Sequence, residues 1–275
     1  MLAICSTCGT QFAESAAPPE RCPICEDIRQ HVPPSGQSWT TLEKLRRSHR
    51  NSFKKIETAL YGIGMAPEFA IGQRALLIRS SSGNVLWDCV SLIDESTIDL
   101  LIGLGGVSAI AISHPHYYTT MVEWSHAFGR VPVYLHAADR DHVQRHDQVI
   151  RFWDGDTFGL QDGITLIRCG GHFAGGAVLH WPQGAEGRGA LLSGDILQVT
   201  MDRKYVSFMR SYPNLIPLSR ASVESIVGAV QPFAYDRIYG AWWDRHIESD
   251  ARAVVHRSLT RYIAALELPD PDGVD

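Results

Sequence analysis

The sequence predicts a layered α/β domain, with helices outside a buried sheet, behind a small cysteine-rich module. Three observations predict this architecture. The chain has 275 residues, 45% of them hydrophobic, which suffices for one large core or a medium core with a small appendage. Strand patterns alternate with helix patterns from residue 66 onward. Four of the six cysteines form two Cys-x-x-Cys pairs near the N-terminus.

The module at residues 1–33 holds Cys5, Cys8, Cys22 and Cys25. Two tight turns that each offer two thiolates give the tetrahedral sulfur cage that zinc prefers, and iron accepts the same ligands. The segment resembles a zinc ribbon or a rubredoxin-type knuckle. It is short and poor in large apolar residues, so we expect a metal to supply much of its folding energy. The spacing predicts a structural zinc site, with an electron-transferring iron as the alternative.

A helical connector is predicted for residues 34–65. A stretch with two prolines and a glycine breaks regular structure first, after which Thr40 and Glu43 fit a capping box. Apolar residues then recur at three- and four-residue steps as far as Leu60. This pattern is typical of an amphipathic helix, which would lead into the main domain at residues 66–275.

The main domain is predicted to alternate strands and helices. A hairpin is expected at 74–92, with its turn at residues 82–84. Further strands are predicted at 107–113, 131–136, 156–171, 175–182, 189–197 and 236–242. Helices are predicted at 96–105, 119–129, 221–230 and near 246–266.

Charge and hydropathy exclude several classes of partner. Charged residues make up 20% of the chain, and the net charge of −5 is not gathered in blocks, so neither nucleic acid nor a membrane surface is expected as a partner. No apolar run approaches the roughly 20 residues that a bilayer requires. The first residues lack the basic and apolar regions of a signal peptide. We therefore expect a cytoplasmic protein that binds a small molecule, and a protein partner that could dock on the module.

Three stretches place metal-binding side chains where predicted strands end. They carry His114 and His116 in SHPH, His172 in CGGHFAGG and Asp195 in LSGD. Ligands on loops at strand ends converge at one edge of a sheet. We therefore expect three imidazoles and one carboxylate to meet around an ion.

The order of these motifs resembles the metallo-β-lactamase superfamily from about residue 66 to about residue 268. The resemblance implies an αββα sandwich with a metal site at its edge. The first motif of that family is His-x-His-x-Asp-His, and here Tyr118 and Thr119 replace its aspartate and its third histidine. Ala241 stands where a late histidine belongs, and His246 would reach the site only if its loop folded back.

These departures imply a site for a single metal. In the family, one metal is bound by the two leading histidines and the middle one, which match His114, His116 and His172. The second metal uses the Asp-His pair and the late histidine, with the aspartate bridging. Only Asp195 remains from that second set. The resemblance therefore implies one zinc or iron ion in a site of three histidines and one aspartate.

A lone metal lowers the pKa of bound water to about 7 and polarises a carbonyl group. The sequence thus predicts a metal-dependent hydrolase of an ester, thioester or lactone. Asp195 would act as a ligand or a general base, and Tyr118 would stabilise an oxyanion or transfer a proton unless it only packs. Residues 201–219 and the Trp242–Trp243 pair would close the pocket.

Two other functions stay open at this point. The lost ligands and the tryptophan-rich rim fit a catalytically inactive scaffold or sensor that contacts a protein through the module. Iron in both sites would instead fit a redox protein, which the visible colour of a ferric sulfur cage would reveal.

Overall fold

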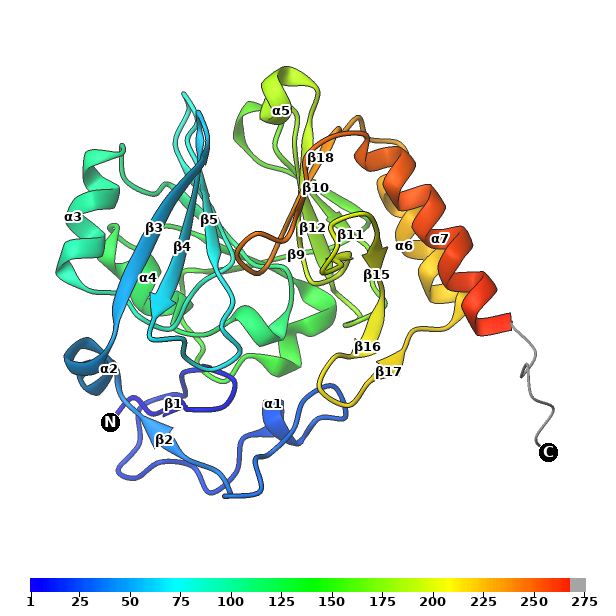
Figure 1. Cartoon of the computed structure of the whole chain (residues 1–275). Coiled ribbons are helices and arrows are strands. Elements are labelled where there is room, and N and C mark those ends of the chain that lie inside the picture. The colour runs from blue at the N-terminus through cyan, green and yellow to red at the C-terminus, as the bar shows by residue number, and fades with distance from the viewer. Residues whose placement is uncertain (268–275) are drawn as a thin grey trace, which may run out of the picture.

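The computed structural model describes residues 1–267, so the last eight residues of the predicted 66–275 domain lie outside the described part. Two β-sheets face each other, and helices cover both outer faces (Figure 1). The predicted αββα sandwich is therefore confirmed. The cysteine-rich module lies across one end of both sheets (Figure 1). No helix within residues 1–267 is both long and apolar enough to cross a bilayer.

The first sheet has seven strands in sequence order. They are β3 (Arg50–Glu57), β4 (Leu60–Ala66), β5 (Ala75–Ile78), β6 (Val85–Trp87), β7 (Ala109–Ala111), β8 (Val133–His136) and β9 (Ile150–Trp153). Strands β3 to β6 are antiparallel, whereas β6 to β9 run parallel. Helices α3 (Glu95–Gly103) and α4 (Met121–Ala127) lie on the outer side of this sheet (Figure 1).

The second sheet has six strands in the order β10-β11-β12-β13-β18-β19. They are β10 (Thr157–Gly159), β11 (Thr165–Arg168), β12 (Ala177–Trp181), β13 (Ala190–Gly194), β18 (Arg237–Gly240) and β19 (His246–Ile247). Helices α6 (Arg220–Val230) and α7 (Ala251–Glu267) cover its outer face (Figure 1). The smaller elements are α5 (Gly184–Gly187), β14 (Gln198–Val199), β15 (Val206–Ser207), β16 (Met209–Ser211) and β17 (Ile216–Pro217).

Alternating side chains of the strands fill separate core layers. In β6, Leu86 faces α3 and α4, whereas Val85 and Trp87 face the second sheet. In β12, Val178 packs under α6 and α7, whereas Leu179 faces the first sheet. Both faces of these strands are buried, which explains why their sequences read as continuous apolar runs.

The predicted helical connector over residues 34–65 is wrong beyond Ser48. Helix α2 (Leu42–Ser48) is capped by Thr41, whose Oγ1 accepts from the Lys44 N–H at 3.3 Å, and the chain then forms β3 and β4. Phe53 packs toward the helices and Ile56 toward the second sheet. A strand that is partly buried on both faces thus imitates the three-residue step of a helix. The sandwich therefore includes the residues from Arg50 onward.

The module contains β1 (Ile4–Cys5), α1 (Pro23–Glu26) and β2 (Trp39–Thr40). Its four cysteines pack with Phe12 and Trp39, whose rings meet edge to face at 5.1 Å. This cluster is the core that the module forms by itself. This core is small, and the module also packs on the sandwich, where Ile4 packs with Leu92.

Candidate functional site

Loops at one edge of the sandwich bring the four predicted ligands together. The chain leaves β7 and reaches His114 and His116 at a 3-10 turn (Pro115–Tyr117). His172 lies on the loop between β11 and β12, and Asp195 directly follows β13. One ligand atom from each of the four side chains lies within 4.8 Å of the others, and all four residues are buried.

Each histidine presents one ring nitrogen to the cluster. His114 Nδ1 lies 2.9 Å from Ser113 Oγ, and His172 Nδ1 donates to the Met209 carbonyl oxygen at 3.1 Å, which leaves Nε2 of both rings facing inward. His116 faces inward through Nδ1, which lies 3.2 Å from His172 Nε2. The hydrogen bonds made by the outer nitrogens fix the orientation of two rings, as neighbours of metal ligands commonly do.

The inward-facing atoms fit a bound cation. His114 Nε2 and Asp195 Oδ1 lie 3.3 Å apart, are buried, and find no hydrogen-bond partner among the described residues. Buried polar atoms without a partner are costly, and a metal ion would satisfy both at once. Three imidazoles with one carboxylate suit zinc or iron.

Burial controls the protonation of these ligands. It lowers the pKa of His114 and of His116 well below the usual value of histidine, and the charge of His172 lowers both further. Burial also raises the pKa of Asp195, which His172 opposes. Neutral imidazole is the form that binds metal, so burial holds His114 and His116 in the ligating state.

Two residues that the sequence reasoning missed support His114. Asp88 Oδ1 accepts hydrogen bonds from both the N–H and the hydroxyl of Ser113 at 2.8 Å, and Ser113 Oγ in turn meets His114 Nδ1. Asp88 follows β6, which pairs in parallel with β7. Because Asp88 comes just after an apolar strand, its position in the sequence could have predicted that it lies at the same edge of the sheet as the ligands.

Tyr118, predicted to be catalytic, does not join the cluster. Its hydroxyl donates to the Asp139 carbonyl oxygen at 3.5 Å, and its ring packs in the core of the first sheet, which is the packing role that the sequence left open for it. Tyr117 lies at the site instead, with its ring centroid 4.4 Å from that of His114. A 3-10 turn has three residues per turn, so residue 117 and not 118 lies above residue 114. Burial and the Asp195 carboxylate raise the pKa of Tyr117.

His246 also stays outside the cluster. It lies in β19, paired with Tyr239, and not at the start of the last helix as predicted. Its Nε2 lies 3.6 Å from the exposed Glu248. Among residues 1–267, the metal-ligating side chains gathered at this edge are therefore the three histidines and Asp195.

A cavity of about 490 Å³ opens onto His116, His172 and Asp195. Its other lining residues are Ser6, Thr7, Arg29, Gln30, His31, Pro33, Ser38, Ala70, Ile71, Tyr212, Pro213 and Trp242. From the predicted wall at 201–219, only Tyr212 and Pro213 therefore reach the cavity. Trp242 lines it as predicted, whereas Trp243 packs on Gly62 and Gly64, where a Cβ atom would lie 2.7 Å from its ring.

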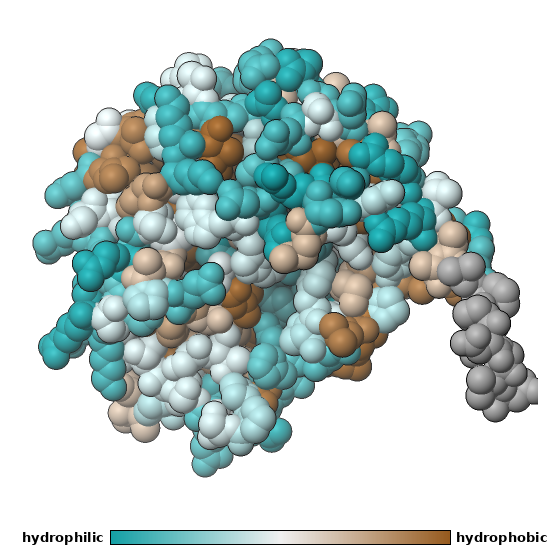
Figure 2. Space-filling view, in the orientation of Figure 1, coloured by the Kyte–Doolittle hydropathy of each residue, from teal (hydrophilic) through white to brown (hydrophobic). Residues whose placement is uncertain are grey.

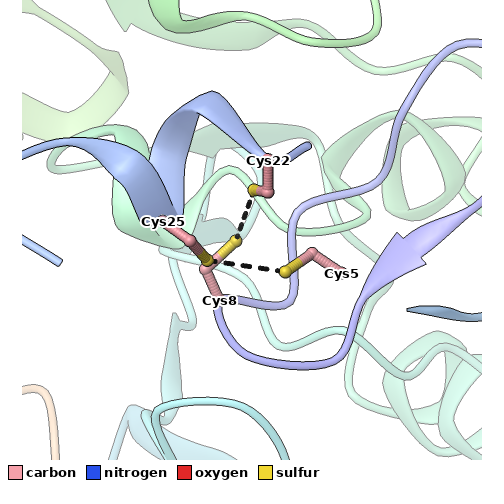
Figure 3. Close-up of side chains that lie close together, drawn as sticks. All are labelled: Cys5, Cys8, Cys22 and Cys25. Atoms are coloured by element: carbon pink, nitrogen blue, oxygen red, sulfur yellow. Dashed lines mark hydrogen bonds between the residues drawn. The ribbon is translucent and has the colours of Figure 1, made fainter. Parts of the chain in front are cut away.

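The four cysteines form a second candidate metal site (Figure 3). Sγ of Cys5 lies 3.5 Å from that of Cys25, and Sγ of Cys8 lies 3.7 Å from that of Cys22. Sulfurs placed tetrahedrally at about 2.3 Å from a zinc ion lie roughly 3.8 Å apart, so the cage fits zinc. Gln37 Nε2 donates to Cys5 Sγ at 3.0 Å, which stabilises a thiolate there.

The face of the molecule shown in Figure 2 mixes hydrophilic and hydrophobic residues. No protein-family model matches the sequence. The uncharacterized protein YmaE of Bacillus subtilis (strain 168) is 51% identical over 265 residues, which cover 96% of each chain.

Solved structures resemble the sandwich. The metallo-β-lactamase DIM-1 superposes with a TM-score of 0.57 at 13% identity, covering 78% of this chain and 98% of its own. VMB-1 gives 0.58 at 13% identity, covering 79% and 98%. The metallo-β-lactamase FIM-1 of Pseudomonas aeruginosa, in its mono-zinc form, gives 0.56 at 12% identity, covering 77% and 95%. At such low identity, these matches establish the fold alone.

Proposed function

Because the chain belongs to the same family as YmaE and has the fold of the metallo-β-lactamases, we propose that it is a metal-dependent hydrolase of a small ester, thioester or lactone. The observation that carries the proposal is the convergence of three histidines and Asp195 beneath an open cavity. A buried ligand set that lines a cavity can hold an ion and still admit a substrate.

The ion would be held by Nε2 of His114, Nδ1 of His116, Nε2 of His172 and the Asp195 carboxylate. When bound, zinc or iron would supply a water of lowered pKa and polarise a carbonyl oxygen. The chain itself orients His114 through Ser113 and Asp88, and it excludes bulk water by burying all four ligands. Tyr117 keeps its proton because its pKa is raised, and its buried hydroxyl finds no hydrogen-bond partner among the described residues.

The substrate class follows from the number of ions that the site can hold. The Asp-His pair and the late histidine of the family are replaced by Tyr118, Thr119 and Ala241, and none of these joins the ligand cluster. The site therefore lacks the ligands for a second ion, which would clamp the attacking and leaving oxygens. Phosphatases and nucleases use such a clamp, whereas a single zinc ion suffices for acyl hydrolysis in sites of the thermolysin type. We therefore propose an acyl compound as the substrate. We also propose that the protein acts in the reducing cytoplasm, where the cysteine thiolates stay free to bind metal.

The proposal is tested by assaying the zinc-loaded full chain against p-nitrophenyl acetate, γ-butyrolactone, an acyl thioester and bis(p-nitrophenyl) phosphate. We expect hydrolysis of at least one acyl compound and none of the phosphodiester. A chelator should abolish that hydrolysis, and added zinc should restore it. A chain that holds a metal in both sites and hydrolyses none of these compounds would favour the scaffold alternative. A coloured preparation with iron in the sulfur cage would favour the redox alternative.

A further inference from the structure

The cysteine module is built into the edge of the candidate active site. Figure 1 shows β1, α1 and β2 lying across the end of both sheets. At the first sheet, the Gln11 N–H donates to the Thr119 carbonyl oxygen at 3.0 Å, and Ser91 Oγ donates to the Gly9 carbonyl oxygen at 3.1 Å. Gly9 has a φ of +80°, and a Cβ there would lie 2.4 Å from Ser91 Oγ. The first Cys-x-x-Cys turn is therefore seated tightly against the residue that replaces the third histidine of the family motif.

The segment after the second Cys-x-x-Cys pair is held on the other side of the site. The Arg29 guanidinium lies 3.8 Å from the centroid of the Phe173 ring, and its Nη1 donates to the His172 carbonyl oxygen at 3.3 Å. Asn214 Nδ2 donates to the carbonyl oxygens of Ile28 and Gln30, both at 2.9 Å. The module thus bridges the loop that carries one metal ligand and the loop that follows β16.

This placement exposes module side chains to the cavity. Ser6 and Thr7 lie between the ligands Cys5 and Cys8, and both line the cavity together with His116 and His172. Gln30 and His31 continue the same wall. We infer that the cysteine module is the substrate-selecting wall of this site and that it fits a small, uncharged acyl compound. The inference rests on the proposed function.

The charges around the cavity indicate that the substrate is uncharged. Among the lining residues, which all fall within the described 1–267, Arg29 is the one arginine or lysine. Asp27 accepts two hydrogen bonds from its guanidinium, at 2.6 and 2.7 Å, so the charge of Arg29 is already neutralised. Ala70, Ile71 and Trp242 make much of the remaining surface apolar. Apart from the ion itself, an anionic group on a substrate would therefore find no unpaired arginine or lysine in this wall.

The experiment uses two hydroxamates that bind zinc through the same head group. Benzohydroxamic acid is otherwise uncharged, whereas succinic monohydroxamic acid carries a carboxylate. Their affinities for the zinc-loaded full chain are measured by isothermal titration calorimetry, and zinc content by mass spectrometry. Thr7→Trp and His31→Trp each narrow the cavity, and His31→Trp does so from an exposed position that does not strain the sulfur cage. Ala17→Trp is the matched control, since Ala17 is exposed and outside the cavity.

We expect the native chain to prefer benzohydroxamic acid. Both narrowing substitutions should weaken its binding by about tenfold or more, as overpacking does, while Ala17→Trp stays within about twofold. If His31→Trp and Thr7→Trp kept their full zinc content and bound benzohydroxamic acid as tightly as the native chain does, the module would not be a wall of the binding site. If succinic monohydroxamic acid bound as tightly as benzohydroxamic acid or more tightly, the inference that the substrate is uncharged would be wrong. A native chain with zinc in both sites that binds neither probe would refute the proposed function, and the inference with it.

Discussion

Replacing His172 by alanine is expected to remove the ion held by the three histidines and Asp195 and to lower kcat/KM for an acyl substrate by roughly three orders of magnitude. His172 Nε2 lies 3.2 Å from His116 Nδ1, so its loss leaves two imidazoles and one carboxylate, which is a poor set for zinc. The contribution of the ion to catalysis is several kcal/mol, and each 1.36 kcal/mol is a factor of about ten in rate. Steady-state kinetics together with metal analysis measure both effects.

The matched control for this variant is His256→Ala. His256 is exposed on α7 and lies far along the chain from the cluster, so its replacement should leave metal content and kcat/KM unchanged. A His172→Ala variant with full metal content and native kinetics would show that the catalytic centre lies elsewhere.

Replacing Cys8 by serine is expected to empty the sulfur cage and unfold the module. Cys8 is fully buried among the other three cysteines, and the module has little further core of its own. Structural zinc supplies roughly 10 kcal/mol or more of folding free energy in such modules, so little else would hold residues 1–33 in place. Zinc content should fall to the single ion bound by the histidines and Asp195, and limited proteolysis should cleave between Cys8 and Cys22.

The same substitution should weaken the binding of benzohydroxamic acid, because Ser6 and Thr7 would leave the cavity wall. Cys89→Ala is the control, since Cys89 is a fully buried thiol of the main domain that lies outside the cage. It should keep both ions and resist the protease. If Cys8→Ser resisted cleavage as well as the Cys89→Ala chain does, the metal would not be what folds the module.

The candidate site was predictable because its ligands follow apolar strands. Asp195 comes directly after β13 and His114 comes shortly after β7, and strand ends at one edge of a sandwich bring their loops together. The αββα order was predictable for the same reason, since strand and helix patterns alternate along the chain. The local sequence pattern and the expected topology were therefore enough to predict those strands that are buried on both faces.

Other features depended on geometry that a local pattern does not carry. Phe53 and Ile56 share a helical spacing, yet they lie on opposite faces of β3. The choice between Tyr117 and Tyr118 was set by a single 3-10 turn after His114. The docking of the module on Thr119 was also beyond sequence patterns, because it depends on contacts between segments more than one hundred residues apart.

The central claim is that the three histidines and Asp195 bind a metal ion, and anomalous scattering tests it most directly. Crystals of the full chain grown with zinc are measured above and below the zinc absorption edge. We predict one peak inside the cysteine cage and a second within coordinating distance of His114 Nε2, His116 Nδ1 and His172 Nε2. A peak in the cage alone, with zinc supplied in excess, would contradict the claim.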